Sequence, residues 1–406
     1  MVIRVLMGAC VVLVVGGCAP GEVGSGAAVE ESSSSTAAIP AGGIPRFEVD
    51  SSWEWPPALP NGEAVGVVSY VAVDRQDHVW VLQRSRQVPA DKQDQAAPPV
   101  LEFDENGNFV QGWGGPADGY DWPDTEHGLF VDYEDNVWLT GLNPLEQSYA
   151  GPTERTDDMI LKFTRRGDFL TQFGGFDRHP LGLGGNADTE SVHLATETVV
   201  FPETNELFVA DGYANRRVLV LDAQTLAFKR MWGAFGIQPP PDLGRDANPT
   251  SGAAKIDLAT TLVDDPKGPE TFNSVHAVKV SNDGLVYVGD RNHRRIQVFT
   301  LDGEYVTQGF VNLEGDDHMT VCGLDFSADP QQEFIYVGDY GNGHVHIVRR
   351  QTLEVVGSFG NYGPSPGDFQ GLHTLAVDSR GNIWTAETQP RPVGSRVQRF
   401  TFKGIS

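Results

Sequence analysis

Three histidines stand at one common position in three similar segments of the chain. His127, His276 and His373 each precede by eleven residues an aromatic residue in the middle of an apolar run. Those aromatic residues are Trp138, Tyr287 and Trp384. Three neutral imidazoles that leave a fourth position open form a typical catalytic zinc site, whereas structural zinc usually has four protein ligands. The spacing therefore predicts a metal centre, provided that the fold brings the three segments together.

The elements that would position these histidines are six β-hairpins of one kind. Each has an apolar run, a polar turn and a second apolar run, usually followed by an acidic residue. The segments are 68–84, 127–141, 199–213, 276–291, 324–340 and 373–387. Short apolar runs separated by Asp, Asn and Gly predict strands and turns, and repeated units of about four strands are typical of a β-propeller. The sequence predicts an all-β fold, a six-bladed β-propeller, closed by pairing residues 46–52 with the last blade because an open sheet edge invites aggregation.

A ring of six blades gives the histidine spacing a geometric meaning. The first strand of each blade lines the central channel, and neighbouring blades are about 60° apart. Histidines in blades two, four and six then converge on the axis, where a metal with a vacant position could polarise an oxygen or activate water. The alternative is that histidine simply begins three inner strands of a wet channel, but the identical register in alternate blades favours a metal. His193 is out of register, and we interpret it as an ordinary histidine.

A second group of residues belongs to the same face of the ring. The start of the first strand and the end of the second strand of an antiparallel hairpin lie together. Arg84 and Arg291 follow the aromatic residue of their blades by four positions, and Tyr213 follows that of blade three by five. Paired arginines would hold a carboxylate, and a tyrosine beside a dication would lose its proton more easily, which makes it a candidate base. The alternative is that the arginines and the tyrosine are ordinary blade-rim residues that pair with Asp211 or Asp290. The acidic residue before these positions recurs in most blades, which favours a structural turn role over a carboxylate site.

The N-terminal segment predicts export and anchoring. Arg4 precedes an apolar stretch that ends in VGGC at Cys18, which is typical of a secretory signal and resembles a bacterial lipobox. We therefore expect residues 1–18 to be a lipoprotein signal peptide with lipid on Cys18, residues 19–44 to be a flexible linker, and residues 45–406 to form the propeller. The expected location is the extracytoplasmic side of a bacterial membrane. A plain signal peptide with a chance cysteine is the alternative.

Composition excludes two classes of protein. If Cys10 leaves with the signal and Cys18 carries lipid, Cys322 is the one remaining thiol, which excludes a disulfide framework. The chain has 29 basic and 55 acidic residues, a formal charge of -26. A strongly acidic surface repels phosphate backbones, so we expect no nucleic-acid partner. We expect a monomer.

These residues resemble the NHL-repeat propellers and, among them, the peptidyl-α-hydroxyglycine α-amidating lyases. The likeness covers roughly residues 60–402. The segment DGYANRR, 211–217, is similar to the family's DGYxNxR segment and places its active-site tyrosine at Tyr213. The run DRNHRRIQ, 290–297, is similar to its DRxxxRIQ run and places an active-site arginine at Arg291. Arg84 and the three histidines fall where the family has another active-site arginine and its zinc ligands.

The resemblance implies an enzyme that cleaves the N–C bond of a C-terminal α-hydroxyglycine and gives a peptide amide and glyoxylate. In that family's chemistry, zinc on the three histidines would polarise the substrate oxygen. Tyr213 would accept the hydroxyl proton, and Arg84 and Arg291 would position the carboxylate or stabilise the phenolate. The implied partner is a small molecule or peptide with a hydroxyglycine-like end.

The sequence also departs from the family. Proline usually precedes the family's zinc histidines, whereas Glu126, Val275 and Leu372 stand here. Thr374 replaces an aspartate that helps to hold a central calcium in the animal enzymes, which weighs against calcium. The chain does not contain the copper oxygenase that makes hydroxyglycine in the bifunctional animal enzyme, so another N-hydroxyalkyl amide or a carbinolamine is an alternative substrate.

Two other functions remain open. One is a non-catalytic NHL-repeat lipoprotein that binds a protein or glycan at its rim, which would leave the threefold histidines unexplained. The other is a gluconolactonase-like hydrolase, for which three imidazoles are too soft a ligand set.

Overall fold

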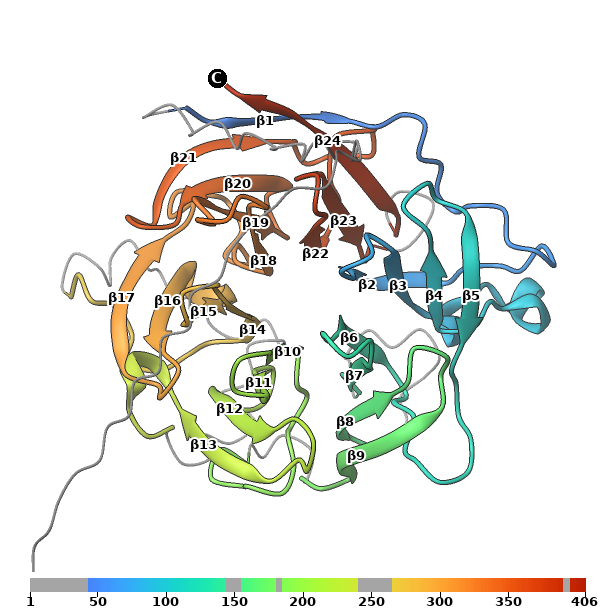
Figure 1. Cartoon of the computed structure of the whole chain (residues 1–406), viewed down its shortest axis with the longest axis horizontal. Coiled ribbons are helices and arrows are strands. Elements are labelled where there is room, and N and C mark those ends of the chain that lie inside the picture. Colours follow the sequence, from blue (N-terminus) through green and yellow to red (C-terminus); the bar gives the residue numbers. More distant parts are fainter. Residues whose placement is uncertain (1–42, 144–154, 180–184, 240–264, 390–394) are drawn as a thin grey trace, which may run out of the picture. The chain divides into compact units, whose positions relative to one another are not determined.

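The computed structural model describes residues 43–143, 155–179, 185–239, 265–389 and 395–406. In this part of the chain, 24 strands form six four-stranded antiparallel sheets, which stand around a central axis (Figure 1). The prediction of an all-β, six-bladed β-propeller is confirmed. No helix of the described residues is long and apolar enough to cross a membrane.

The strands follow one another from the axis outward in each blade. Blade one contains β2 (Val67–Val73), β3 (Val79–Arg84), β4 (Val100–Phe103) and β5 (Phe109–Trp113). Blade two contains β6 (Glu126–Val131), β7 (Val137–Gly141), β8 (Asp157–Phe163) and β9 (Phe169–Phe176). Blade three contains β10 (Glu197–Phe201), β11 (Glu206–Asp211), β12 (Arg217–Asp222) and β13 (Phe228–Trp232).

The second half of the ring repeats this order. Blade four contains β14 (Val275–Val280), β15 (Leu285–Asp290), β16 (Arg295–Thr300) and β17 (Tyr305–Phe310). Blade five contains β18 (Gly323–Phe326), β19 (Phe334–Asp339), β20 (His344–Arg349) and β21 (Glu354–Phe359). Blade six contains β22 (Leu372–Val377), β23 (Ile383–Glu387), β24 (Val397–Ile405) and β1 (Pro45–Val49). Short 3-10 turns occur at Ser85–Gln87, Ala90–Gln95, Ala234–Gly236 and Arg291–His293.

An aspartate at the first turn explains why the tryptophan-marked hairpins form. In blades one, two and six this carboxylate accepts backbone N–H groups of the turn and, six residues later, the indole N–H of the tryptophan. The pairs are Asp74–Trp80 and Asp132–Trp138 at 2.9 Å and Asp378–Trp384 at 3.2 Å. One residue of each turn has a positive φ, and it is an aspartate or a glycine: Asp77, Asp135 and Gly381. These are residue types that tolerate the left-handed region.

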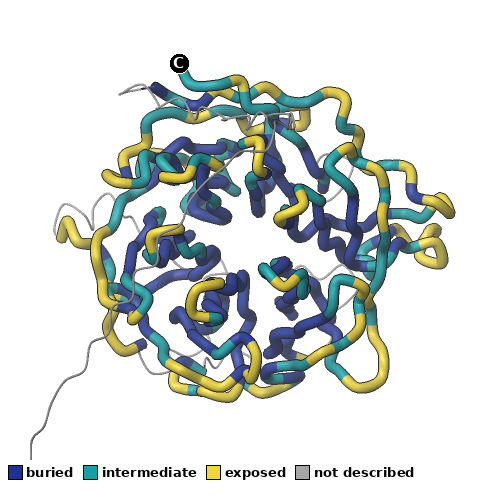
Figure 2. The backbone as a smooth tube through the Cα atoms, viewed as in Figure 1, coloured by how far each residue is buried: buried dark blue, intermediate teal, exposed yellow. Residues whose placement is uncertain are grey.

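The aromatic residues of the second strands form the core. Trp80, Trp138 and Trp384 are fully buried. Trp138 packs in one apolar cluster with Leu207 and Leu219 of blade three, so the residue binds one blade to the next. Replacing such a buried tryptophan by alanine typically costs about 3–5 kcal/mol of stability. Figure 2 shows that burial is concentrated in the inner strands and that exposure increases toward the outer strands.

The ring closes through the two ends of the propeller. β1 pairs antiparallel with β24, with Phe47 opposite Phe402 and Val49 opposite Phe400, and the two strands lie side by side in Figure 1. This confirms the predicted pairing of the 46–52 region with the last blade. The outermost strand of blade six therefore comes from the segment that precedes blade one.

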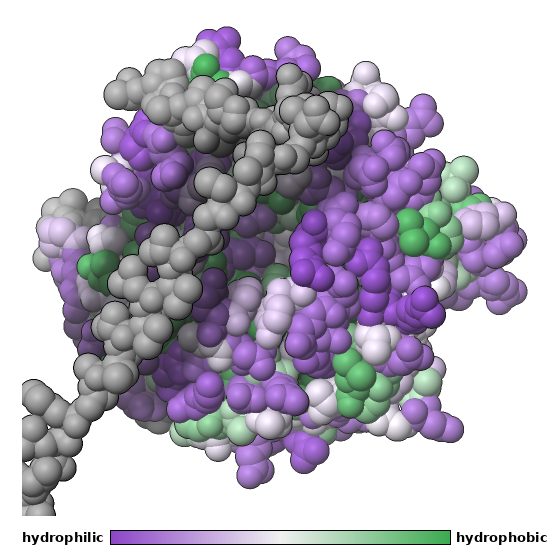
Figure 3. Space-filling view, in the orientation of Figure 1, coloured by the Kyte–Doolittle hydropathy of each residue, from purple (hydrophilic) through white to green (hydrophobic). Residues whose placement is uncertain are grey.

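The face seen along the axis is mostly hydrophilic (Figure 3). The segment expected to be a signal peptide, with Cys18, and nearly all of the expected linker lie outside the described residues, so the boundaries at 18 and 44 stay predictions.

Candidate metal centre

Strand pairing places one residue in or directly before each innermost strand at the same level of the channel. Each second strand has one aromatic residue in its middle, which we call the aromatic marker of the blade: Trp80, Trp138, Phe208, Tyr287, Tyr336 and Trp384. The marker pairs with a residue of the innermost strand, as Tyr287 pairs with Lys279, and the channel residue lies three positions before that partner. The six residues, in blade order, are Ser69, His127, Thr196, His276, Cys322 and His373. Histidine occupies the even blades, and a small polar residue occupies the odd blades.

A β-bulge turns each histidine toward the axis. The pairing register shifts between Glu126 and Leu129, between Val275 and Ala277, and between Leu372 and Thr374. A bulge bends its strand and re-aims a side chain, and bulges often occur beside functional sites. The three rings lie against one another with centroids 4.7, 4.9 and 5.2 Å apart.

The odd blades orient the histidines through backbone carbonyls. Nδ1 of His127, His276 and His373 donates to the carbonyl oxygens of Thr196, Cys322 and Ser69 at 2.9, 2.5 and 2.7 Å. This hydrogen bond fixes the tautomer, because a ring nitrogen that donates its proton leaves the other nitrogen as the ligand atom. One possible ligand atom from each histidine lies within 4.8 Å of the others. The three Nε2 atoms therefore share one small space on the axis.

The electrostatic environment keeps the imidazoles neutral. Burial lowers the pKa of His127 and His276 well below the usual range, and nearby Arg84 or Arg291 lowers it further. Burial, with Arg84 next in effect, lowers the pKa of His373 to about 3. A neutral imidazole is the form that binds a metal. Three such ligands with one open side fit the donor set of catalytic zinc, so these residues could hold a metal.

The hydroxyl of Tyr213 lies at the same centre. It is 2.9 Å from Nε2 of His276 and 3.3 Å from Nε2 of His127, and Nη1 of Arg291 donates to it at 3.0 Å. The guanidinium of Arg291 also lies 5.0 Å from the centroid of the Tyr213 ring. Burial raises the pKa of Tyr213 to about 12, although Arg291 opposes this increase. The phenol is therefore protonated at neutral pH unless a further cation lowers its pKa.

The two predicted arginines approach the centre from different sides. Nε of Arg84 donates to the carbonyl oxygen of Glu126 at 3.0 Å, and the charge of Arg84 lowers the pKa of His127 and His373. Arg291 lies instead beside Tyr213 and His276. Both side chains are buried. The structure thus brings all six predicted residues to one end of the channel.

The recurring acidic residues have other partners. Asp211 accepts from Arg217 at 2.8 Å and from the backbone of His193, and Asp290 accepts from Arg295 at 2.8 Å and from the backbone of Asn273. Each carboxylate ties the end of a second strand to the loop that enters the blade. The predicted structural role of these residues is confirmed.

Ser69 and Thr196 lie at the same level of the channel as the three histidines, and the sequence analysis did not identify them. The hydroxyl of Ser69 donates to the carbonyl oxygens of Glu126 and His127, and that of Thr196 donates to those of Ala210 and Val275. They therefore join the inner strands of neighbouring blades. Ser69 stands eleven residues before Trp80, the same spacing as for the histidines, but a serine there does not indicate a contact between blades.

The channel also contains a cation supplied by the chain itself. Nζ of Lys279 lies 2.9 Å from Glu197, which also accepts a hydrogen bond from the hydroxyl of Tyr70. Burial would lower the pKa of Lys279, but Glu197 and Asp325 raise it. Four blades are thus joined across the axis by one charged cluster.

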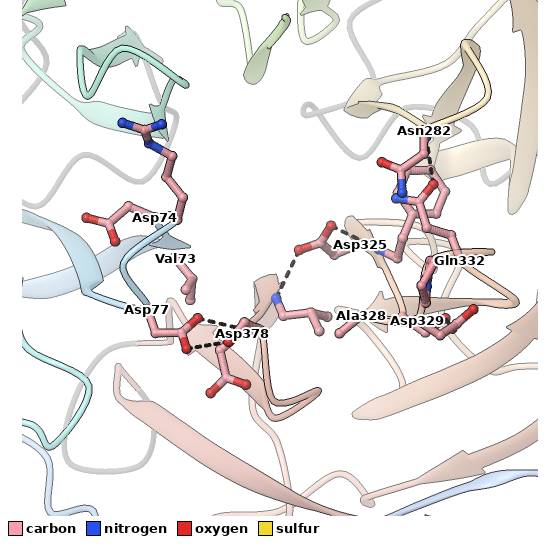
Figure 4. A pocket seen from close by; sticks show the side chains of 15 residues that line it. Val73, Asp74, Asp77, Asn282, Asp325, Ala328, Asp329, Gln332 and Asp378 are labelled. Atoms are coloured by element: carbon pink, nitrogen blue, oxygen red, sulfur yellow. Dashed lines mark hydrogen bonds between the residues drawn. The ribbon is translucent and has the colours of Figure 1, made fainter. Parts of the chain in front are cut away.

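A cavity of about 450 Å³ opens at the hairpin-turn side of the ring (Figure 4). Its carboxylates already have partners within the chain. Asp77 accepts from the backbone and hydroxyl of Ser379, and Asp325 accepts from the backbone of Val377. Asp77 joins two hairpin turns and Asp325 joins two inner strands, so we infer no chemistry from the cavity.

A second group of possible ligands, Asp74, His78 and Glu102, lies in blade one. Arg165 forms ion pairs with both of its carboxylates, at 2.8 Å from Asp74 and closer to Glu102. Both carboxylates thus already pair with a cation of the chain, and we interpret this group as an ion-pair network.

Comparisons with known proteins agree with this geometry. The NHL repeat matches residues 272–299, which include His276 and Arg291. NHL repeat-containing protein 3 of Mus musculus is 27% identical over 270 residues, 64% of this chain and 59% of that protein. Peptidyl-alpha-hydroxyglycine alpha-amidating lyase 1 of Drosophila melanogaster is 25% identical over 386 residues, 87% of this chain and 60% of that protein. Peptidyl-glycine alpha-amidating monooxygenase B of Xenopus laevis is 25% identical over 185 residues, 45% of this chain and 16% of that protein.

The matched regions span about 60% of the length of the mouse and Drosophila relatives. The similarity to the lyase extends over most of the described propeller, whereas the similarity to the monooxygenase covers less than half of this chain. The chain is thus a six-bladed β-propeller with NHL repeats that is distantly homologous to amidating lyases and to NHL repeat-containing protein 3.

Proposed function

We propose that the protein is a zinc-dependent lyase that cleaves the C–N bond of an α-hydroxyglycine-type amide and releases an amide and glyoxylate. The observation that carries this proposal is the position of the Tyr213 hydroxyl, which lies within 3.3 Å of two histidine Nε2 atoms and 3.0 Å from Arg291. The 25% identity to a peptidyl-α-hydroxyglycine α-amidating lyase supports it.

The three histidines would hold the metal through Nε2. Bound zinc would supply a Lewis acid that polarises the substrate oxygen and lowers the pKa of a neighbouring phenol. The remaining chemistry falls to the residues of the chain.

Tyr213 would take the proton of the substrate hydroxyl as that oxygen forms the new C=O bond. The C–N bond breaks at the same carbon, and the amide nitrogen that leaves receives a proton, so that one hydroxyglycine amide gives one amide and one glyoxylate. Arg291 would stabilise the phenolate, because it already donates to the Tyr213 oxygen. Arg84, on the other side of the histidines, would hold the substrate carboxylate with charge-assisted hydrogen bonds.

The proposed setting rests on the sequence alone. Lipid on Cys18 would anchor a monomeric propeller at the outer side of a bacterial membrane. Its partners would be the membrane and a small-molecule or peptide substrate, without nucleic acid.

The test is glyoxylate release from N-acyl-α-hydroxyglycines by the purified, zinc-loaded protein. We expect turnover that chelator abolishes and zinc restores, and that is lost in Tyr213→Phe. His344→Ala is a matched control, because His344 lies on β20 and donates from Nδ1 to the carbonyl of Gly360. A protein that binds no zinc and releases no glyoxylate would instead be a non-catalytic propeller that binds a protein or glycan at its rim.

A further inference from the structure

One more residue lines the metal centre in addition to the six that the sequence indicated. Each blade has one residue four positions after the aromatic residue of its second strand, at the end of the channel that contains the histidines. These residues, in blade order, are Arg84, Leu142, Gly212, Arg291, Tyr340 and Thr388. The ring of Tyr340 lies 6.2 Å from that of His373, at an interplanar angle of 75°.

The Tyr340 ring has a fixed position. Its hydroxyl accepts from Nε2 of Gln389 at 3.0 Å and lies 3.4 Å from Oγ1 of Thr388. Gly371 lets the ring approach, because a Cβ at that position would lie 3.2 Å from Cε2 of Tyr340. Gly371 also has a φ of +68°, which other residues rarely adopt. Two blades thus hold the ring beside His373.

The charged groups of the site surround the histidines, and both arginines also act on Tyr340. Tyr213 and Arg291 lie near His276, and Arg84 acts on His127 and His373. Tyr340 is half-buried, whereas the six predicted residues are at most 6% exposed. The side of Tyr340 is thus where a bound molecule can continue from the buried centre toward solvent.

We propose that Tyr340 is a specificity-determining residue that packs against the acyl group next to the scissile C–N bond and favours flat, apolar acyl groups. The inference rests on the proposed function and names its substrate class: N-aroyl or similar N-acyl α-hydroxyglycines. An aromatic pair of good geometry favours the flat group by about three- to tenfold.

The experiment compares kcat/KM for N-benzoyl- and N-acetyl-α-hydroxyglycine. We expect the wild-type protein to prefer the benzoyl substrate about three- to tenfold beyond any intrinsic difference. Tyr340→Phe should retain the preference, and Tyr340→Leu, which keeps apolar volume but loses the flat ring, should bring the ratio close to one. Tyr133→Leu is the control, because Tyr133 lies in the turn between β6 and β7 and bonds Asn205.

Binding separates this inference from the proposed function. N-benzoylglycine and N-acetylglycine lack the hydroxyl group and cannot be cleaved, so calorimetry with the zinc-loaded protein reports recognition alone. Tighter binding of benzoylglycine that Tyr340→Leu removes supports the inference even if no glyoxylate is released, which would reject the lyase. Equal affinities in the wild type, a ratio that survives Tyr340→Leu, or no binding of either acylglycine overturns the inference.

Discussion

Zinc should raise the melting temperature of this protein by a few degrees, and each of the three histidine-to-alanine substitutions should abolish the increase. The ligands come from β6, β14 and β22, which are brought together by the closed ring. The unfolded chain therefore presents no comparable site. A ligand that binds the folded state alone, at 100 times its Kd, stabilises that state by about 2.7 kcal/mol.

The size of the protein sets the expected temperature shift. The propeller contains roughly 360 residues between positions 43 and 406. An unfolding entropy of about 2.1 cal/mol/K per residue then gives about 0.8 kcal/mol/K for a cooperative transition. A stabilisation of about 2.7 kcal/mol corresponds to an increase of about 3–4 °C.

Scanning calorimetry of chelator-treated protein, with zinc titrated back, measures this shift. The three variants should lose it to a similar extent, because each histidine is held in the same way by a carbonyl of the next odd blade. His344→Ala should keep it. A zinc-induced increase that survives any one of the three substitutions, or no increase in the wild type at saturating zinc, would refute the axial site.

Tyr213→Phe should keep the zinc-induced stabilisation but lower kcat for glyoxylate release by about 10²–10⁴-fold, the usual contribution of a general base; a kcat near the wild-type value would contradict that role. Hydrogen bonds from two basic residues on β13 lower the pKa of Glu206 to about 2, so the folded state favours the carboxylate. As pH falls from about 5 toward 2, Glu206 should by itself account for a loss of about 2–3 kcal/mol of unfolding free energy. Glu206→Gln should remove this loss in urea titrations, and the exposed Glu203→Gln should retain it; equal pH profiles would contradict the assignment. Lys279→Met leaves Glu197 without its cation and should cost about 3–5 kcal/mol in the same assay, and adding Glu197→Gln should recover part of this cost. An unchanged stability would show that the pair contributes little.

The histidines could be predicted because the even blades keep one hairpin length. Their turns place the aromatic marker eleven residues after the ligand in all three cases. Blade three places Thr196 twelve residues before Phe208, and blade five places Cys322 fourteen residues before Tyr336, because its turn is longer. Simple counting therefore misses these two positions, and strand pairing finds them.

Other features of the site cannot be predicted from the types of the amino acids. The hydrogen bonds that orient the histidines use backbone carbonyls, which every residue possesses. The bulges that aim the histidines at the axis depend on the strand register. Tyr340 is one of several aromatic residues in its blade, and its nearness to His373 depends on how blades five and six pack.

The alternation of ligands and carbonyls makes the metal centre a property of the contacts between blades. His127 depends on blade three, His276 on blade five and His373 on blade one for orientation. The last of these contacts crosses the joint between blades six and one, the same joint that the β1–β24 pairing stabilises. Because partners that orient a metal-bound histidine typically contribute 10–100-fold to metal affinity, the closure of the ring and the geometry of the centre are linked. No single blade, and no single histidine, defines the site.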